Sequence, residues 1–159
     1  MLFRSRRGFT LIELVIALAI LAVVVTMAAP VLKLQVQRQK EAELRQALRD
    51  IRGAIDAYKK AGDDGVIAKR ADQSGYPARL EDLVVGVPNQ KDPGGGAKYF
   101  LRRIPRDPMN ADQNLAPAAT WGLRSYASPP EAPSAGEDVF DVYSRSEGTA
   151  IDGTHYRDW

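Results

Sequence analysis

The chain has 159 residues, 22 of them basic and 20 acidic, with a formal net charge of +2, no cysteine and one histidine. This near balance of charge gives no support to nucleic-acid binding. The lack of cysteine excludes a disulfide-held fold, and a single histidine excludes multi-histidine metal sites and most nucleophile–base pairs. We therefore expect no enzymatic activity, and a glycosidase-like carboxylate pair is the one catalytic alternative left open.

An apolar run follows a basic start. Arg4, Arg6 and Arg7 precede residues 9–32, a stretch of about 24 residues that as a helix measures about 36 Å, against a hydrocarbon core of about 30 Å. We predict that residues 9–34 cross a membrane, with the amino terminus in the cytoplasm. A secretory signal peptide is the rival, but its apolar part is about 7 to 15 residues long and ends at a cleavage site.

The junction Gly8-Phe9-Thr10-Leu11-Ile12-Glu13 resembles the class III signal of type IV pilins and type II secretion pseudopilins. In that family a prepilin peptidase cuts after the glycine and methylates the new amino terminus. The resemblance implies that leader residues 1–8 are removed, that Phe9 becomes N-methylated, and that the net charge falls to about −1. Pro30 matches a proline that often kinks the family's helix, and we expect a kink there.

Glu13 is the one carboxylate of the apolar run. A charged side chain in hydrocarbon costs about 2.5 to 3.5 kcal/mol on insertion scales, so it usually marks a partner or a function. The resemblance implies that Glu13 pairs with the free amino terminus of a neighbouring subunit and so sets the register of assembly. The alternative is that Glu13 extends to the membrane surface and has no role.

Residues 35–61 continue as an amphipathic helix. Its apolar positions recur at helical spacing: Val36, Leu44, Leu48, Ile51, Ile55 and Tyr58. The other faces carry polar side chains that we expect in solvent: Gln37, Arg38, Lys40, Glu41, Glu43, Arg45, Arg49, Asp50 and Arg52. Gly53 weakens such a helix by about 1 kcal/mol relative to alanine. Glycines and aspartates at 61–65 predict the helix end.

Residues 62–98 are predicted to be irregular except for a short helix over about 78–85. Three motifs follow in order, Tyr76-Pro77, Leu80 to Leu83, and Ile104-Pro105-Arg106-Asp107-Pro108. Their order resembles that of the major pseudopilins of type II secretion.

Residues 121–126 and 138–144 alternate apolar and polar side chains, as half-buried strands do, and a proline-rich connection at 127–136 separates them. We predict a small antiparallel sheet packed on the outer half of the helix. These patterns predict an α+β fold class, and the resemblance implies that it is type IV pilin-like, with a head formed by residues 62–159.

The resemblance also implies a contact between subunits. Asp56 and Arg103 occupy positions where the major pseudopilins form a salt bridge between neighbours, although Arg52 replaces an acid one turn before Asp56 and would weaken or redirect that pair. The alternative is two exposed charges worth at most about 1 kcal/mol.

The carboxy-terminal residues 144–159 hold a metal candidate that the resemblance also implies. The corresponding loop of the major pseudopilins binds calcium, and Glu147, Asp152 and the carbonyls of Arg145 or Ala150 offer oxygen ligands of the kind calcium needs. The family's paired aspartates are missing. The alternative is a hydrogen-bonded loop pinned by Trp159 against the head.

Taken together, the resemblance implies a structural subunit of a helical pseudopilus, anchored once in the bacterial inner membrane with its head in the periplasm. Its expected partners are copies of itself, prepilin peptidase, minor pseudopilins, the inner-membrane assembly platform and the membrane. A type IV pilin of a surface fibre is the alternative, although the lack of a cysteine pair favours the pseudopilin. A membrane-anchored binding module is a third reading.

Overall fold

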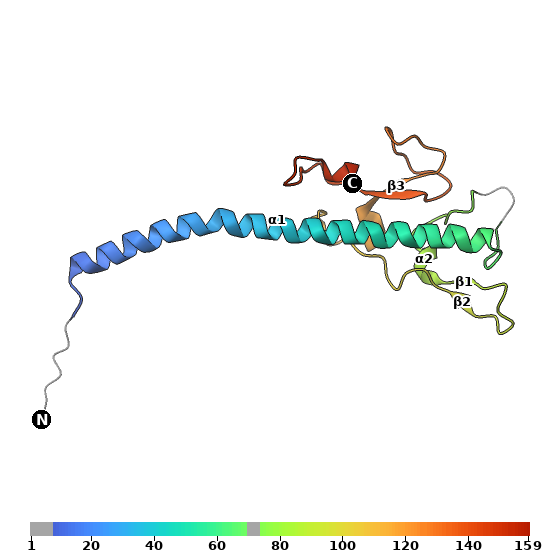
Figure 1. Cartoon of the computed structure of the whole chain (residues 1–159), viewed down its shortest axis with the longest axis horizontal. Coiled ribbons are helices and arrows are strands. Elements are labelled where there is room, and N and C mark those ends of the chain that lie inside the picture. The colour runs from blue at the N-terminus through green and yellow to red at the C-terminus, as the bar shows by residue number, and fades with distance from the viewer. Residues whose placement is uncertain (1–7, 70–73) are drawn as a thin grey trace, which may run out of the picture. The chain divides into compact units, whose positions relative to one another are not determined.

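The computed structural model describes residues 8–69 and 74–159, with no side-chain description at 27–31. It divides into two compact units, Met1–Gln39 and Lys40–Trp159. The elements in chain order are α1 (Leu11–Asp63), α2 (Asp82–Val85), β1 (Val87–Pro88), β2 (Ala97–Lys98), a 3-10 helix η1 (Pro117–Thr120), β3 (Trp121–Arg124), β4 (Asp141–Ser144) and a 3-10 helix η2 (Tyr156–Asp158). The long helix and small antiparallel sheets confirm the α+β, type IV pilin-like fold (Figure 1).

Both ends of α1 are capped by residues that the sequence supplies there. At the start, the Thr10 hydroxyl oxygen accepts a hydrogen bond from the Glu13 amide at 3.3 Å, the bond typical of a threonine N-cap. At the end, the Val66 amide donates to the Ala61 carbonyl at 2.8 Å, and Gly65 adopts a positive φ of 66°. This is the Schellman arrangement, in which glycine avoids the strain that a side chain would meet. The predicted end at 61–65 is confirmed.

One face of α1 forms the core of the unit Lys40–Trp159. Leu44, Ile51 and Ile55 are fully buried, and Leu48 is 3% exposed. They pack in one cluster with residues of the head: Leu80, Leu83, Trp121, Val139, Val142, Ala150 and Tyr156. The apolar spacing read from the sequence therefore identified the helix face that the head covers.

The sheets are smaller than predicted. Strands β3 and β4 pair antiparallel, with Trp121 opposite Ser144 and Leu123 opposite Val142, so the two predicted strands are confirmed with shorter limits. The predicted helix over 78–85 is reduced to α2, because residues 80–81 form a turn before it. A second antiparallel pair, β1 with β2, was not predicted, since two residues per strand are too few to show alternation.

Two glycines, Gly53 within α1 and Gly65 just after its end, predict opposite effects of the same substitution. A methyl group at Gly53 would meet no atom within 4 Å, whereas Gly65 has the positive φ described above. In urea unfolding, Gly53→Ala should raise the free energy of unfolding by about 0.5–1 kcal/mol. Gly65→Ala should lower it by about 1–2 kcal/mol. Equal effects of the two substitutions would contradict this description of the helix end.

Candidate functional site

The first part of α1 carries apolar side chains that its own unit leaves uncovered. Each of the following is at least 53% exposed: Phe9, Leu11, Ile12, Leu14, Val15, Ile16, Leu18, Ile20, Leu21, Val23, Val24 and Val25. Contiguous exposed apolar surface of this kind marks contact with another protein or with a membrane. Apolar residues lie on every side of this part of the helix, so it has no polar face suited to contact with water.

Glu13 lies in the first turn of α1, among these apolar residues. A carboxylate at a helix start is favoured by the helix dipole, so the position is also locally stable. Gly8 and Phe9 precede the helix and are exposed, with Phe9 at 84%. The predicted processing bond is therefore outside regular structure, while Arg4, Arg6 and Arg7 lie outside the described residues.

Among the residues that the structure describes, no helix is both long and apolar enough to cross a membrane. The assignment of residues 9–34 to a membrane span thus stays a prediction from the sequence. Position 30 lies within α1, but the Pro30 side chain is outside the described ones, so the expected kink also stays a prediction.

The first two sequence motifs serve the core of the head. Leu80 and Leu83 are buried in the cluster against α1, and the carbonyl of buried Pro77 accepts the Val139 amide at 2.8 Å. Tyr76 stacks near Tyr126, with ring centroids 5.7 Å apart. These residues hold loops of the head on the helix.

Asp107 of the third motif is a buried connecting carboxylate, 2% exposed. Its Oδ2 accepts the Ser144 hydroxyl at 2.6 Å and its Oδ1 accepts the Met109 amide at 2.8 Å. Its own amide donates to the Thr120 hydroxyl oxygen at 3.1 Å. Asp107 thus ties its loop to β4 and to η1, because a buried carboxylate is stable only when its oxygens are hydrogen-bonded.

Asp56 and Arg103, the predicted subunit contact, are both exposed. Arg103 lies with Ile104 and Pro105 along a shallow groove against α1 residues Ala47 and Asp50. Within residues 8–69 and 74–159, Arg103 has no ion pair in its own chain, and the contact with Asp56 of a neighbour stays a prediction.

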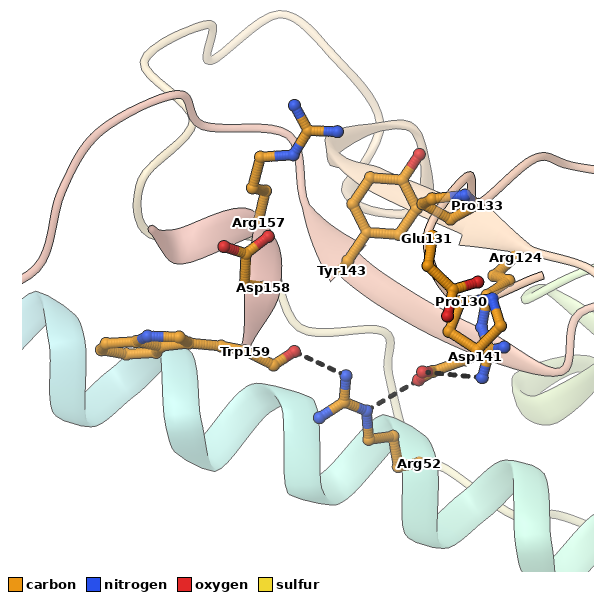
Figure 2. A pocket seen from close by; sticks show the side chains of 10 residues that line it. All are labelled: Arg52, Arg124, Pro130, Glu131, Pro133, Asp141, Tyr143, Arg157, Asp158 and Trp159. Atoms are coloured by element: carbon orange, nitrogen blue, oxygen red, sulfur yellow. Dashed lines mark hydrogen bonds and ion pairs between the residues drawn. The ribbon is translucent and has the colours of Figure 1, made fainter. Parts of the chain in front are cut away.

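Arg52, expected in solvent, points into the head (Figure 2). It donates to Asp141 at 2.7 Å, to the Val142 carbonyl at 3.1 Å and to the main-chain oxygen of Trp159 at 2.7 Å. Arg124 lies 3.6 Å from the same Asp141 carboxylate. These charges compensate one another at the wall of a cleft of about 540 Å³, so Arg52 anchors the head. Its expected effect on a pair between Asp56 and a neighbouring subunit stays a prediction.

The calcium candidates do not form a fitting site. Asp152 Oδ1 accepts the Thr154 amide at 3.0 Å and hydroxyl at 2.6 Å, and Oδ2 lies 3.6 Å from the Arg45 guanidinium. The Ala150 carbonyl accepts the Gly153 amide at 3.0 Å, and Glu147 is exposed. Nowhere in the described chain do three acidic or histidine side chains come together as metal ligands.

Sequence reasoning missed the role of Glu41, which was expected in solvent. It is 4% exposed, and its Oε1 accepts the Ile151 amide at 2.9 Å and the Tyr156 hydroxyl at 3.0 Å. A signal was present, because Glu41 precedes Leu44 and Leu48 at the three- and seven-residue steps of the buried face. The rule that charged residues face water hid it.

Comparisons with known proteins give similarity both at the amino terminus and over most of the chain. The family model described as the prokaryotic N-terminal methylation motif matches residues 3–29. Three similar proteins are each named type II secretion system core protein G. That of Klebsiella pneumoniae is 27% identical over 86% of this chain and 94% of its own, and that of Dickeya chrysanthemi is 28% identical over 75% and 73%. That of Pectobacterium carotovorum subsp. carotovorum is 30% identical over 69% and 66%. No solved structure shows significant similarity.

The Asp107 contacts predict that substitution of this residue strongly lowers the free energy of unfolding. Asp107→Ala leaves the buried Ser144 hydroxyl and Met109 amide without their acceptor and should lower the free energy of unfolding by about 2–4 kcal/mol. Asp112→Ala is the matched control. The exposed Asp112 side chain accepts the nearby Asn114 amide, and its main-chain oxygen, which accepts Arg106, is kept in the variant, so the substitution should cost less than about 1 kcal/mol. Urea unfolding of both variants checks this, and similar costs would show that Asp107 has no connecting role.

Proposed function

Because this chain is a relative of type II secretion system core protein G and carries the N-terminal methylation motif, we propose that it is a structural subunit of a type II secretion pseudopilus. The single observation that carries the proposal is the uncovered apolar surface of Phe9 and of α1 from Leu11 to Val25, with Glu13 in the first turn of the helix. Such a surface requires apolar cover, and the membrane before assembly and copies of the same helix after assembly both provide it.

Processing by prepilin peptidase is the first step of this proposal. Cleavage between Gly8 and Phe9 removes the three leader arginines and creates a free, then methylated, amino group on Phe9. The leader arginines keep the amino terminus in the cytoplasm, so the helix crosses the inner membrane once and the head lies in the periplasm.

Assembly then pairs opposite charges in an apolar setting. The new amino group of one subunit is positive, and the Glu13 carboxylate of its neighbour is negative. In surroundings of low dielectric constant these charges attract more strongly than in water, and pairing offsets the cost of removing each from water. Because Glu13 is the one acid of the apolar stretch, the pair fixes one register between neighbouring helices.

The proposed work of the filament is mechanical, and the chain itself carries no reaction. Growth of the pseudopilus from the inner-membrane assembly platform, with minor pseudopilins among its subunits, would push exported proteins outward as a piston or screw. A cytoplasmic ATPase outside this chain would supply the energy. Likeness to structural pseudopilins supports this non-enzymatic role.

Neutralising Glu13 tests the assembly step. In cells, Glu13→Gln keeps the size of the side chain and removes its charge, so leader removal should continue while sheared filaments fall below detection. Glu43→Gln, an exposed acid elsewhere on α1, is the matched control and should leave filament yield unchanged. Immunoblots report processing, and electron microscopy of sheared filaments reports assembly. Wild-type filament yield in Glu13→Gln would contradict the proposed pairing.

Charge reversal tests the proposed contact between Asp56 and Arg103 of neighbouring subunits. Asp56→Arg and Arg103→Asp should each lower filament yield, by about fivefold if the exposed pair contributes about 1 kcal/mol. The double reversal should restore it, since the pair is rebuilt with opposite signs. Arg102→Asp in place of Arg103→Asp is the control and should give no rescue. Failure of the double reversal to recover yield would exclude this bridge.

A further inference from the structure

The carboxy-terminal segment, residues 149–159, is held on α1 by charged side chains of the helix. Glu41 accepts two hydrogen bonds from the segment, and Arg52 donates to its last main-chain oxygen, as described above. Arg45 lies between them, one turn after Glu41 and on the same face of α1. All of these contacts belong to the compact unit Lys40–Trp159.

Arg45 makes two contacts with the segment at once. Its guanidinium carbon lies 4.0 Å from the centre of the Trp159 ring, the geometry of a cation–π contact, and one of its nitrogens lies 3.6 Å from Asp152 Oδ2. The planar guanidinium can stack on an indole and face a carboxylate together, which a lysine ammonium does less well. Arg45 therefore connects the loop that contains Asp152 with the aromatic residue that closes it.

The loop completes this connection from its own side. The Trp159 indole N–H donates to the Thr154 hydroxyl oxygen at 2.7 Å, and that hydroxyl donates to Asp152 Oδ1 at 2.6 Å. The hydrogen bonds from Thr154, and next the charge of Arg45, hold the pKa of Asp152 below its ordinary value. The carboxylate is thus charged at neutral pH and already compensated.

A calcium ion would meet an unfavourable site here. Its positive charge would lie beside the Arg45 guanidinium, and like charges a few ångströms apart repel. Its best carboxylate, Asp152, would first have to leave Thr154 and Arg45. Two of the ligands that the resemblance implies, Asp152 and the Ala150 carbonyl, already serve the loop itself.

We propose that Arg45 closes the carboxy-terminal loop onto α1 by bridging Asp152 and Trp159, in the loop where the resemblance implies a calcium ion, so that this head is stable without the ion. The loop lacks the paired aspartates of the family because the Arg45 guanidinium, a cation of α1, stabilises the loop in their place. This inference is independent of whether the chain works in secretion or in a surface fibre.

The test compares thermal unfolding of the full chain in detergent for the wild type and three variants. Arg45→Ala should lower the midpoint by about 2–4 °C, the shift expected in a chain of this size for losing one such contact pair. The midpoint of Arg45→Lys should lie between those of the wild type and Arg45→Ala, because lysine keeps the charge but loses the stacking. Arg49→Ala is the matched control. Among the described residues, exposed Arg49 hydrogen-bonds Gln46 on its own helix and no residue of the carboxy-terminal segment, so the substitution should leave the midpoint unchanged.

Calcium is then added to the wild type after treatment with a chelator, and the midpoint should not move. A ligand that binds only the folded state must raise it, so a calcium-dependent rise would overturn the proposal. An Arg45→Ala effect no larger than that of Arg49→Ala would overturn it too. If Arg45→Ala does not fold, terbium luminescence of the wild type decides. The proposal expects no calcium-displaceable signal sensitised by Tyr156 or Trp159, and such a signal would contradict it.

Discussion

The structure depends on how apolar surface is distributed along one helix. In the unit Lys40–Trp159, α1 has a single apolar stripe, and the head buries it completely at Leu44, Ile51 and Ile55. From Leu11 to Val25, the helix is apolar on all sides except at Glu13, and its own unit leaves these side chains uncovered. Folding of the head removes the first apolar surface from water, whereas the second can be removed from water only by contact with other molecules. The proposed assembly thus follows from the sequence pattern of α1.

Polar contacts of charged side chains, buried or half-buried, add to the apolar core in holding the head together and on α1. Asp107 joins its loop to β4, Glu41 holds the carboxy-terminal segment, and Arg52 reaches both β4 and Trp159. Each is a charged group whose partners lie far away in the sequence. Contacts of this kind specify one arrangement, because a misplaced loop would leave a buried charge without a partner. They compensate for short strands and for the absence of disulfides.

Sequence patterns predicted the periodic features well. The buried stripe of α1, its end at glycine and the two strands of the β3–β4 pair all carry a local signal of spacing or turn residues. The roles of Glu41, Arg45 and Arg52 could not be predicted in this way, because they depend on partners about 90 to 115 positions away. Spacing placed Glu41 on the buried face but did not reveal its partners. The calcium expectation came from resemblance, and the position of Arg45 beside Asp152, which no spacing rule reveals, argues against it.

The central claim is that the apolar part of α1 stays on the mature chain and is buried among copies of itself. Intact-mass measurement of subunits from filaments sheared off native cells tests this most directly. The account predicts one species that corresponds to residues 9–159 with a single added methyl group. A subunit that still begins at Met1, or one that lacks the apolar part of α1, would contradict it.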